Sequence, residues 1–418
     1  MTNNINRRDF LKVLGLGAFL SINPLQLSAA TIPHIVIVGA GFAGATCAKY
    51  LKMWGGASVD VTVIEENSSY VSPILSNLVL NSQKTTNDLT FSYTPLKDTY
   101  KVSVINKSLS SIDKSAKSLT LADGTVVSYD KLVLAPGIDF SYTNAYDTNK
   151  VPHAWKSGDG INTLKDQVQA LKEGDTFIMT IPKSPFRCPP GPYERACVVA
   201  DYLKNTKKIN VEVIVLDENS DIIVEKDSFM AKFNSYGINY LPSSVVSNVN
   251  DTNMSIDYVQ SGVTKSFSAQ VINVIPNQKA AKIIFDAGLN SGNWAPVDTI
   301  SYESTIQNDI HIIGDSQGSS QPKAGHIANS EAKVCADAIL RTLNNEVLYA
   351  NPKTNSACYS PVSSNEATWL TAVYSYDSST KDMQLVNTKD FPSSGSASLS
   401  NYTAMFLWSG NLFSDTFK

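Results

Sequence analysis

The first part of the chain combines two strand patterns with one helical pattern. Residues 34–38 form a continuous apolar run, and residues 59–64 form a second strand pattern, in which polar Asp60 and Thr62 alternate with valines. Residues 39–44 between them are rich in glycine, and residues 45–52 have a helical pattern. Continuous apolar runs are typical of parallel strands that are buried on both faces. The pattern therefore predicts a strand, a glycine turn, a helix and a second, parallel strand.

The glycine turn has the spacing of a dinucleotide-binding loop. Gly39 permits the tight turn, Gly41 lets a pyrophosphate approach the backbone, and Gly44 lets the helix pack closely on the strand. Glu65 follows the second strand, about 20 residues beyond the glycines, where it would accept hydrogen bonds from a ribose. Together these features predict a bound dinucleotide. The alternative is a glycine-rich turn without a nucleotide.

Two later strands also end in tight turns. One apolar strand ends at Gly137, a pattern that commonly closes the first half of an FAD domain. Another ends at Gly314 and Asp315, and a helical pattern from 327 to 343 follows. In FAD enzymes of this architecture such an aspartate binds the ribityl chain, and the helix N-terminus points at the flavin. Lys323 either assists that positive helix end or is an ordinary surface lysine.

Residues 146–277 repeat the order of strand, helix and strand without a second glycine loop. Apolar strands are predicted at 176–181 and 211–216. The segment 182–192 after the first of them contains five prolines and Cys188. Proline has no N–H group, so this segment is unsuited to binding a pyrophosphate. The sequence therefore predicts a second Rossmann-like domain with sulfur chemistry in place of an NAD(P) site.

Charge and composition narrow the class of partner. The chain has 418 residues, of which 43% are hydrophobic, and a net charge of −4. Residues 1–30 carry Arg7, Arg8 and Lys12 against Asp9, a net charge of +2, so the remainder carries −6. An acidic chain argues against nucleic acid as a partner and favours a basic protein.

Residues 1–30 have the features of an export signal. The pair Arg7–Arg8 is followed by a short apolar run from 13 to 22 and by the cleavage-type segment 27–30. This order predicts a twin-arginine signal peptide and a periplasmic protein; the alternative is a chance pair of arginines before an apolar helix. The apolar run is too short to span a bilayer, and no later stretch of sequence is long enough.

The cysteines of the chain give no sign of a metal site. They are Cys47, Cys188, Cys197, Cys335 and Cys358. None forms a CxxC pair or a zinc-type cluster, so no metal is expected. An oxidising compartment permits a disulfide, and the odd number leaves at least one thiol free. Cys47 is expected to pack in the core, and the sequence assigns no role to Cys197 and Cys335.

Four unusual strings of sequence carry a family resemblance. They are residues 185–195 (PFRCPPGPYER), 274–280 (VIPNQKA), 294–298 (WAPVD) and 357–360 (ACYS). With these strings the chain resembles the flavoprotein subunit of flavocytochrome c sulfide dehydrogenase and, more distantly, the sulfide:quinone oxidoreductases. The resemblance extends over essentially the whole chain after the leader.

The patterns and the resemblance together imply an α/β fold with two Rossmann-like domains of the dinucleotide-binding type and a C-terminal α+β cap domain. The FAD-binding domain would comprise residues 31–145 and 278–345. The second Rossmann-like domain, residues 146–277, would be inserted between them. Residues 346–418 would form a C-terminal flavin-binding domain of the sulfide dehydrogenase type, built of strands and a short helix.

The resemblance implies a redox disulfide between Cys188 and Cys358 beside the flavin. Hydrosulfide would attack this disulfide, pass two electrons to FAD and leave as zero-valent sulfur or polysulfide. The alternative is a purely structural disulfide that ties the cap to the second domain. Glu194 lies within one helical turn of the proline-rich segment, where it would either transfer protons or cap the helix.

The resemblance also implies FAD as the cofactor and a c-type cytochrome subunit as the electron acceptor. The family often attaches FAD covalently to a cysteine, but the matching residues 70–77 contain none. FAD is therefore expected to be held non-covalently. The chain has no CxxCH motif, so haem is expected only on a partner subunit.

Two other functions stay open. In a sulfide:quinone oxidoreductase a membrane quinone would accept the electrons; the apolar segment 405–413 is short and lacks flanking basic residues, so at most peripheral membrane contact is expected. A non-catalytic sulfur carrier or redox partner is the other, against which the presence of both Cys188 and Cys358 argues. The missing glycine loop disfavours an NAD(P)H-dependent disulfide reductase.

Overall fold

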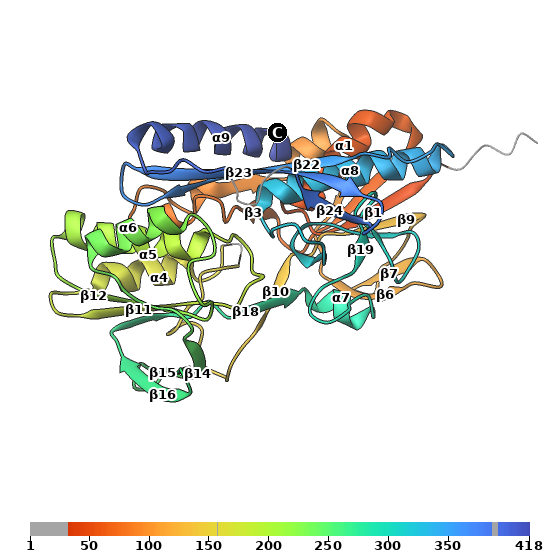
Figure 1. The fold of residues 1–418 in the computed structure, drawn as a ribbon. Coiled ribbons are helices and arrows are strands. Elements are labelled where there is room, and N and C mark those ends of the chain that lie inside the picture. Colours follow the sequence, from red (N-terminus) through yellow and green to blue (C-terminus); the bar gives the residue numbers. More distant parts are fainter. Residues whose placement is uncertain (1–31, 157, 387–391) are drawn as a thin grey trace, which may run out of the picture. The chain divides into compact units, whose positions relative to one another are not determined.

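Residues 33–418 are built around two mainly parallel sheets, as the computed structural model shows (Figure 1). The structure describes residues 32–156, 158–386 and 392–418. The predicted twin-arginine signal, residues 1–30, lies outside the described residues.

The larger sheet contains the strand that leads into the glycine turn. Its seven strands, in spatial order, are β19 (Val297–Asp298), β20 (Glu303–Ser304), β21 (Ile310–Ile312), β9 (Lys131–Leu134), β1 (His34–Val38), β2 (Asp60–Ile64) and β5 (Ser103–Ile105). The strands from β21 to β5 are parallel. Ile35 and Ile37 enter the core on one face of the sheet, and Val36 enters the core on the other. Burial on both faces explains the continuous apolar run.

Helices cover one face of this sheet, and small strands with a short helix cover the other. The elements are α1 (Phe42–Gly55) and α8 (Gly325–Leu343) on the first face, and β6 (Leu109–Asp113), β7 (Ser118–Leu121), β8 (Val126–Ser128) and α7 (Lys282–Asp286) on the second. α1 and α8 pack directly on each other (Figure 1). Small residues such as Ala45, Ala48 and Ala336 allow this close approach.

The second sheet is fully parallel. Its strands, in spatial order, are β13 (Asn239–Leu241), β12 (Glu212–Asp217), β11 (Thr176–Ile181) and β17 (Val271–Asn273). The helical segments of this part are α4 (Ile161–Ala170), α5 (Gly191–Asp201), the π-helical Tyr202–Lys207 and α6 (Lys226–Tyr236). One face of the sheet packs on the antiparallel strands β14 (Val245–Asn250), β15 (Ser255–Gln260) and β16 (Val263–Ser268).

The chain passes between the two sheets twice. β10 (Ile138–Ser141) leaves the first sheet and pairs antiparallel with β18 (Asn277–Ala280), which returns to it. The smaller elements near the first sheet are β3 (Ser69–Val71), β4 (Thr90–Ser92), α2 (Asn77–Leu80), α3 (Thr94–Asp98) and the 3₁₀ turns Gly56–Ser58, Asn87–Leu89 and Gly314–Ser316.

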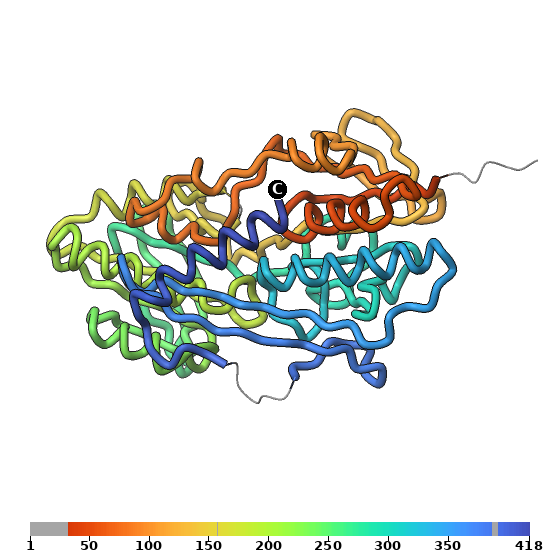
Figure 2. The backbone as a smooth tube through the Cα atoms, turned by 90° about the horizontal axis from the view of Figure 1, so that it is seen from above, coloured from red at the N-terminus to blue at the C-terminus, as the bar shows by residue number. Residues whose placement is uncertain are grey.

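The C-terminal part is an antiparallel sheet with one long helix. Its elements are β22 (Lys353–Pro361), β23 (Ala367–Asp377), β24 (Asp382–Leu385) and α9 (Leu399–Phe417). α9 lies along β22 and β23, and its end reaches α1 (Figure 2). The expectation of a short helix in this part is wrong, because α9 has 19 residues. Tyr402, Met405, Ser409, Leu412 and Thr416 give it one buried face at helical spacing.

These elements confirm the expected fold class, with two Rossmann-like sheets, the first mainly and the second fully parallel, and an α+β C-terminal part. The domain boundaries stay predictions. Among the described residues, no helix has the length and apolar character needed to cross a membrane. Within the same residues, no group of three or more histidine, cysteine or acidic side chains is placed to hold a metal ion.

Candidate active site

The glycine turn and the ends of the parallel strands form one pocket, called here the nucleotide pocket. Of the residues predicted to bind the cofactor, it is lined by Gly39, Gly41, Glu65, Gly137, Gly314 and Asp315. They come from the carboxyl ends of β1, β2, β9 and β21, where parallel sheets commonly bind ligands. Gly44 and Lys323 do not line this pocket.

Two of the glycines cannot carry a side chain. A Cβ atom on Gly39, whose φ is +92°, would lie 2.4 Å from the carbonyl oxygen of Ala135. A Cβ atom on Gly44 would lie 1.8 Å from the carbonyl oxygen of Gly39, so this glycine serves helix–strand packing. α1 begins after Gly41 without a side-chain cap, which leaves N–H groups directed at the pocket. This geometry suits an anionic group such as a pyrophosphate.

Glu65 holds the glycine turn from the end of β2. Its Oε2 atom accepts a hydrogen bond from the backbone N–H of Ala40 at 2.9 Å. Its Oε1 atom accepts bonds from the backbone N–H and the side-chain amide of Asn67 at 2.9 and 3.0 Å. A carboxylate has about four acceptor positions, so Glu65 retains capacity for a ribose hydroxyl.

Asp315 presents an unsatisfied acceptor in the nucleotide pocket. Its Oδ1 atom is buried without a hydrogen-bond partner, and its Oδ2 atom lies 3.9 Å from Nη1 of Arg187. Burial raises the pKa of the Asp315 carboxyl, and the charges of Arg187 and Lys323 act in the opposite direction. A buried acceptor without a partner fits a ligand with hydroxyl donors, such as the ribityl chain of FAD. The residues of this pocket therefore fit the expected cofactor.

Lys323 is buried, so the alternative of an ordinary surface lysine is wrong. The residue is only 4% exposed, and its ammonium group donates a hydrogen bond to the carbonyl oxygen of Gln317 at 2.6 Å. The same group lies 3.7 Å from the centre of the Trp294 ring. Burial lowers the pKa of Lys323 to about 8. The residue that reaches the cavity at this helix end is Gly325, the first residue of α8.

Glu331 of α8 supports the Gly314–Asp315 turn, and the sequence analysis missed it. Its Oε2 atom accepts a hydrogen bond from the backbone N–H of Gly314 at 2.7 Å, and its Oε1 atom accepts one from the side chain of Gln317. Full burial raises the pKa of Glu331 to about 8. The sequence could have pointed to Glu331, because an acidic residue stands there at a position where the helical pattern predicts an apolar one.

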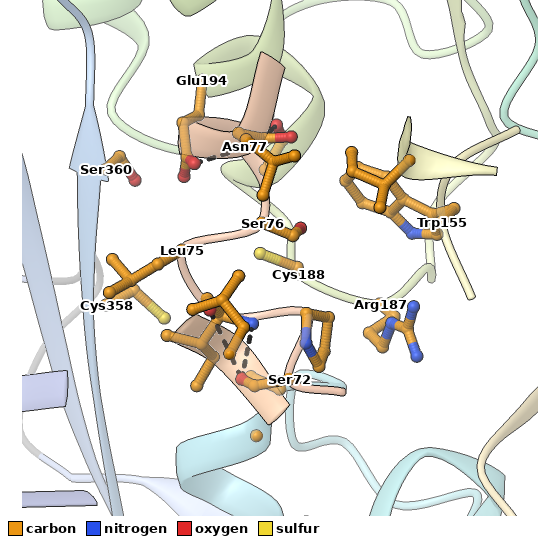
Figure 3. A pocket seen from close by; sticks show the side chains of 18 of the residues that line it. Ser72, Leu75, Ser76, Asn77, Trp155, Arg187, Cys188, Glu194, Cys358 and Ser360 are labelled. Atoms are coloured by element: carbon orange, nitrogen blue, oxygen red, sulfur yellow. Dashed lines mark hydrogen bonds between the residues drawn. The ribbon is translucent and has the colours of Figure 1, made fainter. Parts of the chain in front are cut away.

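Cys188, Cys358 and Glu194 line a second pocket, called here the cysteine pocket. Cys188 comes from the segment before α5, Glu194 from the first turn of α5, and Cys358 from β22. Figure 3 shows both sulfur atoms directed into this pocket. Most of its wall is apolar and includes Leu75 and Trp155. The fold thus brings together two cysteines that are far apart in the sequence.

The structure holds both cysteines as free thiols and does not show the expected disulfide. Burial raises the pKa of the Cys188 thiol well above its usual value, and the nearby Cys358 and Glu194 raise it further. Arg187 acts in the opposite direction. Burial raises the pKa of Cys358 to about 12. The charge of Arg187 and the backbone N–H of Gly191 therefore both favour an anionic sulfur at Cys188.

The backbone around Cys188 is tightly constrained. Cys188 has a φ of +59°, and its N–H group donates to the carbonyl oxygen of Lys323 at 2.7 Å. Its own carbonyl oxygen accepts a bond from the N–H of Gly191 at 2.9 Å. A Cβ atom on Gly191 would lie 2.8 Å from the Cys188 sulfur and 2.8 Å from the Trp155 ring. Gly191 therefore leaves the room that the Cys188 side chain occupies.

Glu194 is held by a neighbouring amide and does not cap its helix. Its Oε1 atom accepts a hydrogen bond from Nδ2 of Asn77 at 2.8 Å, and the N-terminus of α5 has no side-chain cap (Figure 3). Burial raises the pKa of Glu194 to about 8, although Asn77 and Arg195 lower it. The side chain is therefore poised to gain or lose a proton near neutral pH.

Arg195 fixes this arrangement and was not identified from the sequence as a site residue. It is fully buried and donates to Oδ1 of Asn77 at 2.9 Å, which leaves Nδ2 of Asn77 for Glu194. It also donates to the carbonyl oxygen of His153 and to Oδ1 of Asn273. The planar guanidinium of arginine carries five N–H donors, so it can bind several buried acceptors at once. No local pattern marks these partners, because they lie on separate elements.

The two pockets share part of their walls. Five residues line both of them: Val71, Pro73, Lys156, Arg187 and Gly325. Arg187 thus lies between the sulfur atoms of the cysteine pocket and the carboxylate of Asp315 in the nucleotide pocket. A cofactor in one pocket and a substrate in the other would meet at these five residues.

The carboxylate at the end of β12, where a second nucleotide would meet the second sheet, already has partners within the protein. Asp217, at the end of β12, is fully buried and accepts hydrogen bonds from the hydroxyl groups of Tyr193 and Tyr240, both at 2.8 Å. Asn219 donates to the same carboxylate. Groups of the protein thus already form hydrogen bonds with the carboxylate that could have bound a ribose. Cys197, like Cys47 and Cys335, is buried outside the cysteine pocket.

Comparison with known proteins gives two matching family models. Residues 161–276 match the central part of the sulfide dehydrogenase [flavocytochrome c] flavoprotein chain. Residues 33–181 match the pyridine nucleotide-disulphide oxidoreductases. A probable ferredoxin reductase, CtmF, from Castellaniella defragrans is 32% identical over 106 residues. That match covers 25% of this chain and only about a quarter of the relative (26%).

Solved structures show the same fold over most of the chain. The sulfide:quinone oxidoreductase of Aquifex aeolicus superimposes with a TM-score of 0.78 at 16% identity and covers 92% of both chains. NDH2 of Plasmodium falciparum superimposes with a TM-score of 0.65 at 13% identity, over 81% of this chain and 90% of that one. The chain therefore has the pyridine nucleotide-disulphide oxidoreductase fold, and its resemblance to the flavoprotein chain of flavocytochrome c sulfide dehydrogenase is confirmed.

Proposed function

We propose that this chain is an FAD-dependent sulfide dehydrogenase that oxidises hydrosulfide to zero-valent sulfur or polysulfide. One observation carries the proposal: Cys188 and Cys358 line a single pocket that adjoins the nucleotide pocket through shared residues. The match of residues 161–276 to the sulfide dehydrogenase flavoprotein chain supports the same substrate.

FAD would be held in the nucleotide pocket without a covalent bond. The backbone at Gly39 and Gly41 and the N-terminus of α1 would bind the pyrophosphate, and Oδ1 of Asp315 would accept a hydrogen bond from a hydroxyl group. None of the described residues that line this pocket is a cysteine. When bound, FAD supplies an acceptor for two electrons that can release them singly. The buried contacts of Asp217 argue against a second, NAD(P) site.

The two cysteines would carry the sulfur chemistry from a Cys188–Cys358 disulfide. The sulfur of hydrosulfide forms a bond to one cysteine sulfur while the disulfide bond breaks, which leaves a persulfide on one cysteine and a thiolate on the other. The disulfide then re-forms as zero-valent sulfur leaves, with loss of two electrons, and the persulfide proton passes to Glu194. Arg187 stabilises the anionic sulfur.

A c-type cytochrome subunit is the proposed electron acceptor, and the periplasm is the proposed location. The family of the matched central segment and the Arg7–Arg8 pair support these proposals. A membrane quinone is the second candidate, because the chain shares its fold with a sulfide:quinone oxidoreductase and α9 exposes Leu399 and Leu407. Export is tested by replacing Arg7 and Arg8 with lysine and measuring the periplasmic fraction, which should fall.

Anaerobic stopped-flow mixing of the FAD-loaded protein with sulfide tests the proposal. We expect the flavin absorbance of the wild type to bleach rapidly, and Cys188→Ser and Cys358→Ser to bleach at least about 100-fold more slowly. Cys197→Ser, a buried cysteine outside the pocket, is the matched control and should keep the rate. Equal, slow bleaching of all variants would contradict the proposal and favour a non-catalytic carrier. Turnover with cytochrome c or with a soluble quinone then separates the two acceptors.

A further inference from the structure

A buried polar cluster formed by Glu225, Ser360 and Thr368 lies beside the cysteine pocket. Ser360 of β22 is the antiparallel partner of Thr368 of β23, and both are fully buried. Glu225 directly precedes α6 and has a left-handed backbone, with a φ of 49°. α5, which carries Glu194, packs on both α6 and β22. Three separate elements thus meet here around polar side chains.

Four oxygen atoms of this cluster are buried without a hydrogen-bond partner of normal geometry. They are both carboxyl oxygens of Glu225, Oγ of Ser360 and Oγ1 of Thr368. Thr368 is still near enough to lower the pKa of Glu225. Buried polar atoms are almost always satisfied by protein or by ordered water. A site with several such atoms from three elements has the number of polar partners that a buried water needs.

The cluster reaches the cysteine pocket at one end. Ser360 lines that pocket together with Glu194 and Cys358 (Figure 3). The charge of Glu225 raises the pKa of Glu194 and of Cys358. The pocket therefore has a second acidic group behind the one that lines it.

The other end of the cluster approaches the surface. The carboxyl oxygens of Glu225 are buried, but the residue as a whole is partly exposed. The next residue, Lys226, forms a surface ion pair with Asp221 at 2.5 Å. Glu225 thus stands between solvent and the wall of the cysteine pocket.

We propose that Glu225, with water held by Ser360 and Thr368, carries protons between Glu194 and solvent. The inference rests on the proposed function, in which conversion of hydrosulfide to zero-valent sulfur releases two electrons and one proton. The electrons leave through the acceptor, and because a cytochrome takes up electrons alone, the proton is released to solvent over the cycle. Glu194 takes it from the sulfur, water passes it to Glu225, and Glu225 releases it. Glu225 does not touch the sulfur and is a relay residue.

The two acids have similar proton affinities, so a proton can pass between them. Burial raises the pKa of Glu194 to about 8 and that of Glu225 to about 7. The groups that face Glu225 are Glu194 on α5, Cys358 on β22 and Thr368 on β23; on its own segment, Lys226 is paired with Asp221. A proton on Glu194 therefore has a nearby acceptor of similar affinity.

Infrared titration of the resting protein tests the coupling of the two acids without any turnover. We expect Glu225→Gln to move the titration midpoint of Glu194 to lower pH, because a neighbouring negative charge is removed. Glu194→Gln identifies the Glu194 band. Glu366→Gln removes a more exposed carboxylate that pairs with Lys232 and should leave the midpoint in place. An unchanged midpoint in Glu225→Gln would overturn the inference.

Steady-state turnover with sulfide and cytochrome c tests the relay itself. We expect Glu225→Gln to slow turnover by about 100-fold, to increase its slowing in D₂O, and to alter its pH profile. Glu225→Asp should restore part of the rate, and Thr368→Val should slow it with Glu225 intact. A Glu225→Gln variant with the wild-type pH profile would overturn the relay. A wild type that does not oxidise sulfide would overturn the proposed function, and the infrared titration would still test the coupling.

Discussion

The substitution Glu194→Gln isolates the energetic cost of a carboxyl group buried beside the cysteine pocket. Asn77 donates to Glu194 at 2.8 Å, and Oδ1 of Asn77 is held by Arg195. The amide nitrogen of Asn77 therefore has to face residue 194, and the side-chain oxygen of a glutamine can accept the same hydrogen bond. The substitution removes the charge and preserves the shape and the contact.

The sign and size of the effect follow from the shifted pKa. Burial raises the pKa of Glu194 from 4.5 in the unfolded chain to about 8. Between these values the folded protein binds more protons than the unfolded one, so the free energy of unfolding falls as the pH rises. The difference between these two pKa values corresponds to about 5 kcal/mol once the group is fully ionised. The wild type loses this stability toward alkaline pH, and the glutamine variant keeps it.

Urea unfolding of both proteins between about pH 5 and pH 9 measures the difference, with and without added FAD. We expect the free energies of unfolding to agree at the acidic end. The variant should become more stable than the wild type by about 5 kcal/mol toward the alkaline end. A difference that does not change with pH would refute the reasoning, because it would mean that Glu194 ionises without cost in the folded protein.

Three further substitutions test the geometry of the two pockets. Gly191→Ala should displace the Cys188 sulfur and slow sulfide-dependent flavin bleaching about tenfold or more, whereas Gly410→Ala, on an open helix position, should raise stability by about 0.5–1 kcal/mol in a urea titration. Asp315→Ala should weaken FAD binding by about 10- to 100-fold, measured by fluorescence titration, because a charged hydrogen bond contributes about 1.5–3 kcal/mol. Arg195→Met should lower the free energy of unfolding by about 3–5 kcal/mol. Lysine at that position should restore little of it, because it lacks the planar fork.

The glycine turn was predictable because its constraints are local. A Cβ atom on Gly44 would come within 3 Å of the backbone of Gly39 as soon as the strand, turn and helix form, so the spacing of these two glycines in the sequence already encodes the contact. The strand ends at Gly137 and Gly314 follow in the same way from apolar runs that stop at a turn. Asp315 then falls at the carboxyl edge of a parallel sheet, where the fold brings strand ends together.

The environment of the cysteines was not predictable from spacing, since it depends on contacts between distant elements. Cys188 and Cys358 could be paired only through the family resemblance. Lys323 was left open as a surface residue because its burial against Trp294 depends on the folded loop. Asn77 and Arg195 carry no local signal, and their bond joins α2 to α5 across 118 positions. Patterns among neighbouring residues in the sequence therefore do not identify side chains whose hydrogen-bond partners are distant in the sequence.

The junction between a strand and the following helix occurs in both Rossmann-like sheets, before α1 and before α5, and its chemistry differs between the two. At α1 the same junction of strand and helix is open, has glycines and presents N–H groups to a nucleotide pocket. At α5 the preceding segment contains prolines, and Cys188 lies at the helix N-terminus with Glu194 in the first turn. Helix N-termini stabilise anions, whether phosphate or thiolate. Burial opposes a charged sulfur here, so the helix end and Arg187 together would have to favour the thiolate that the proposed reaction requires.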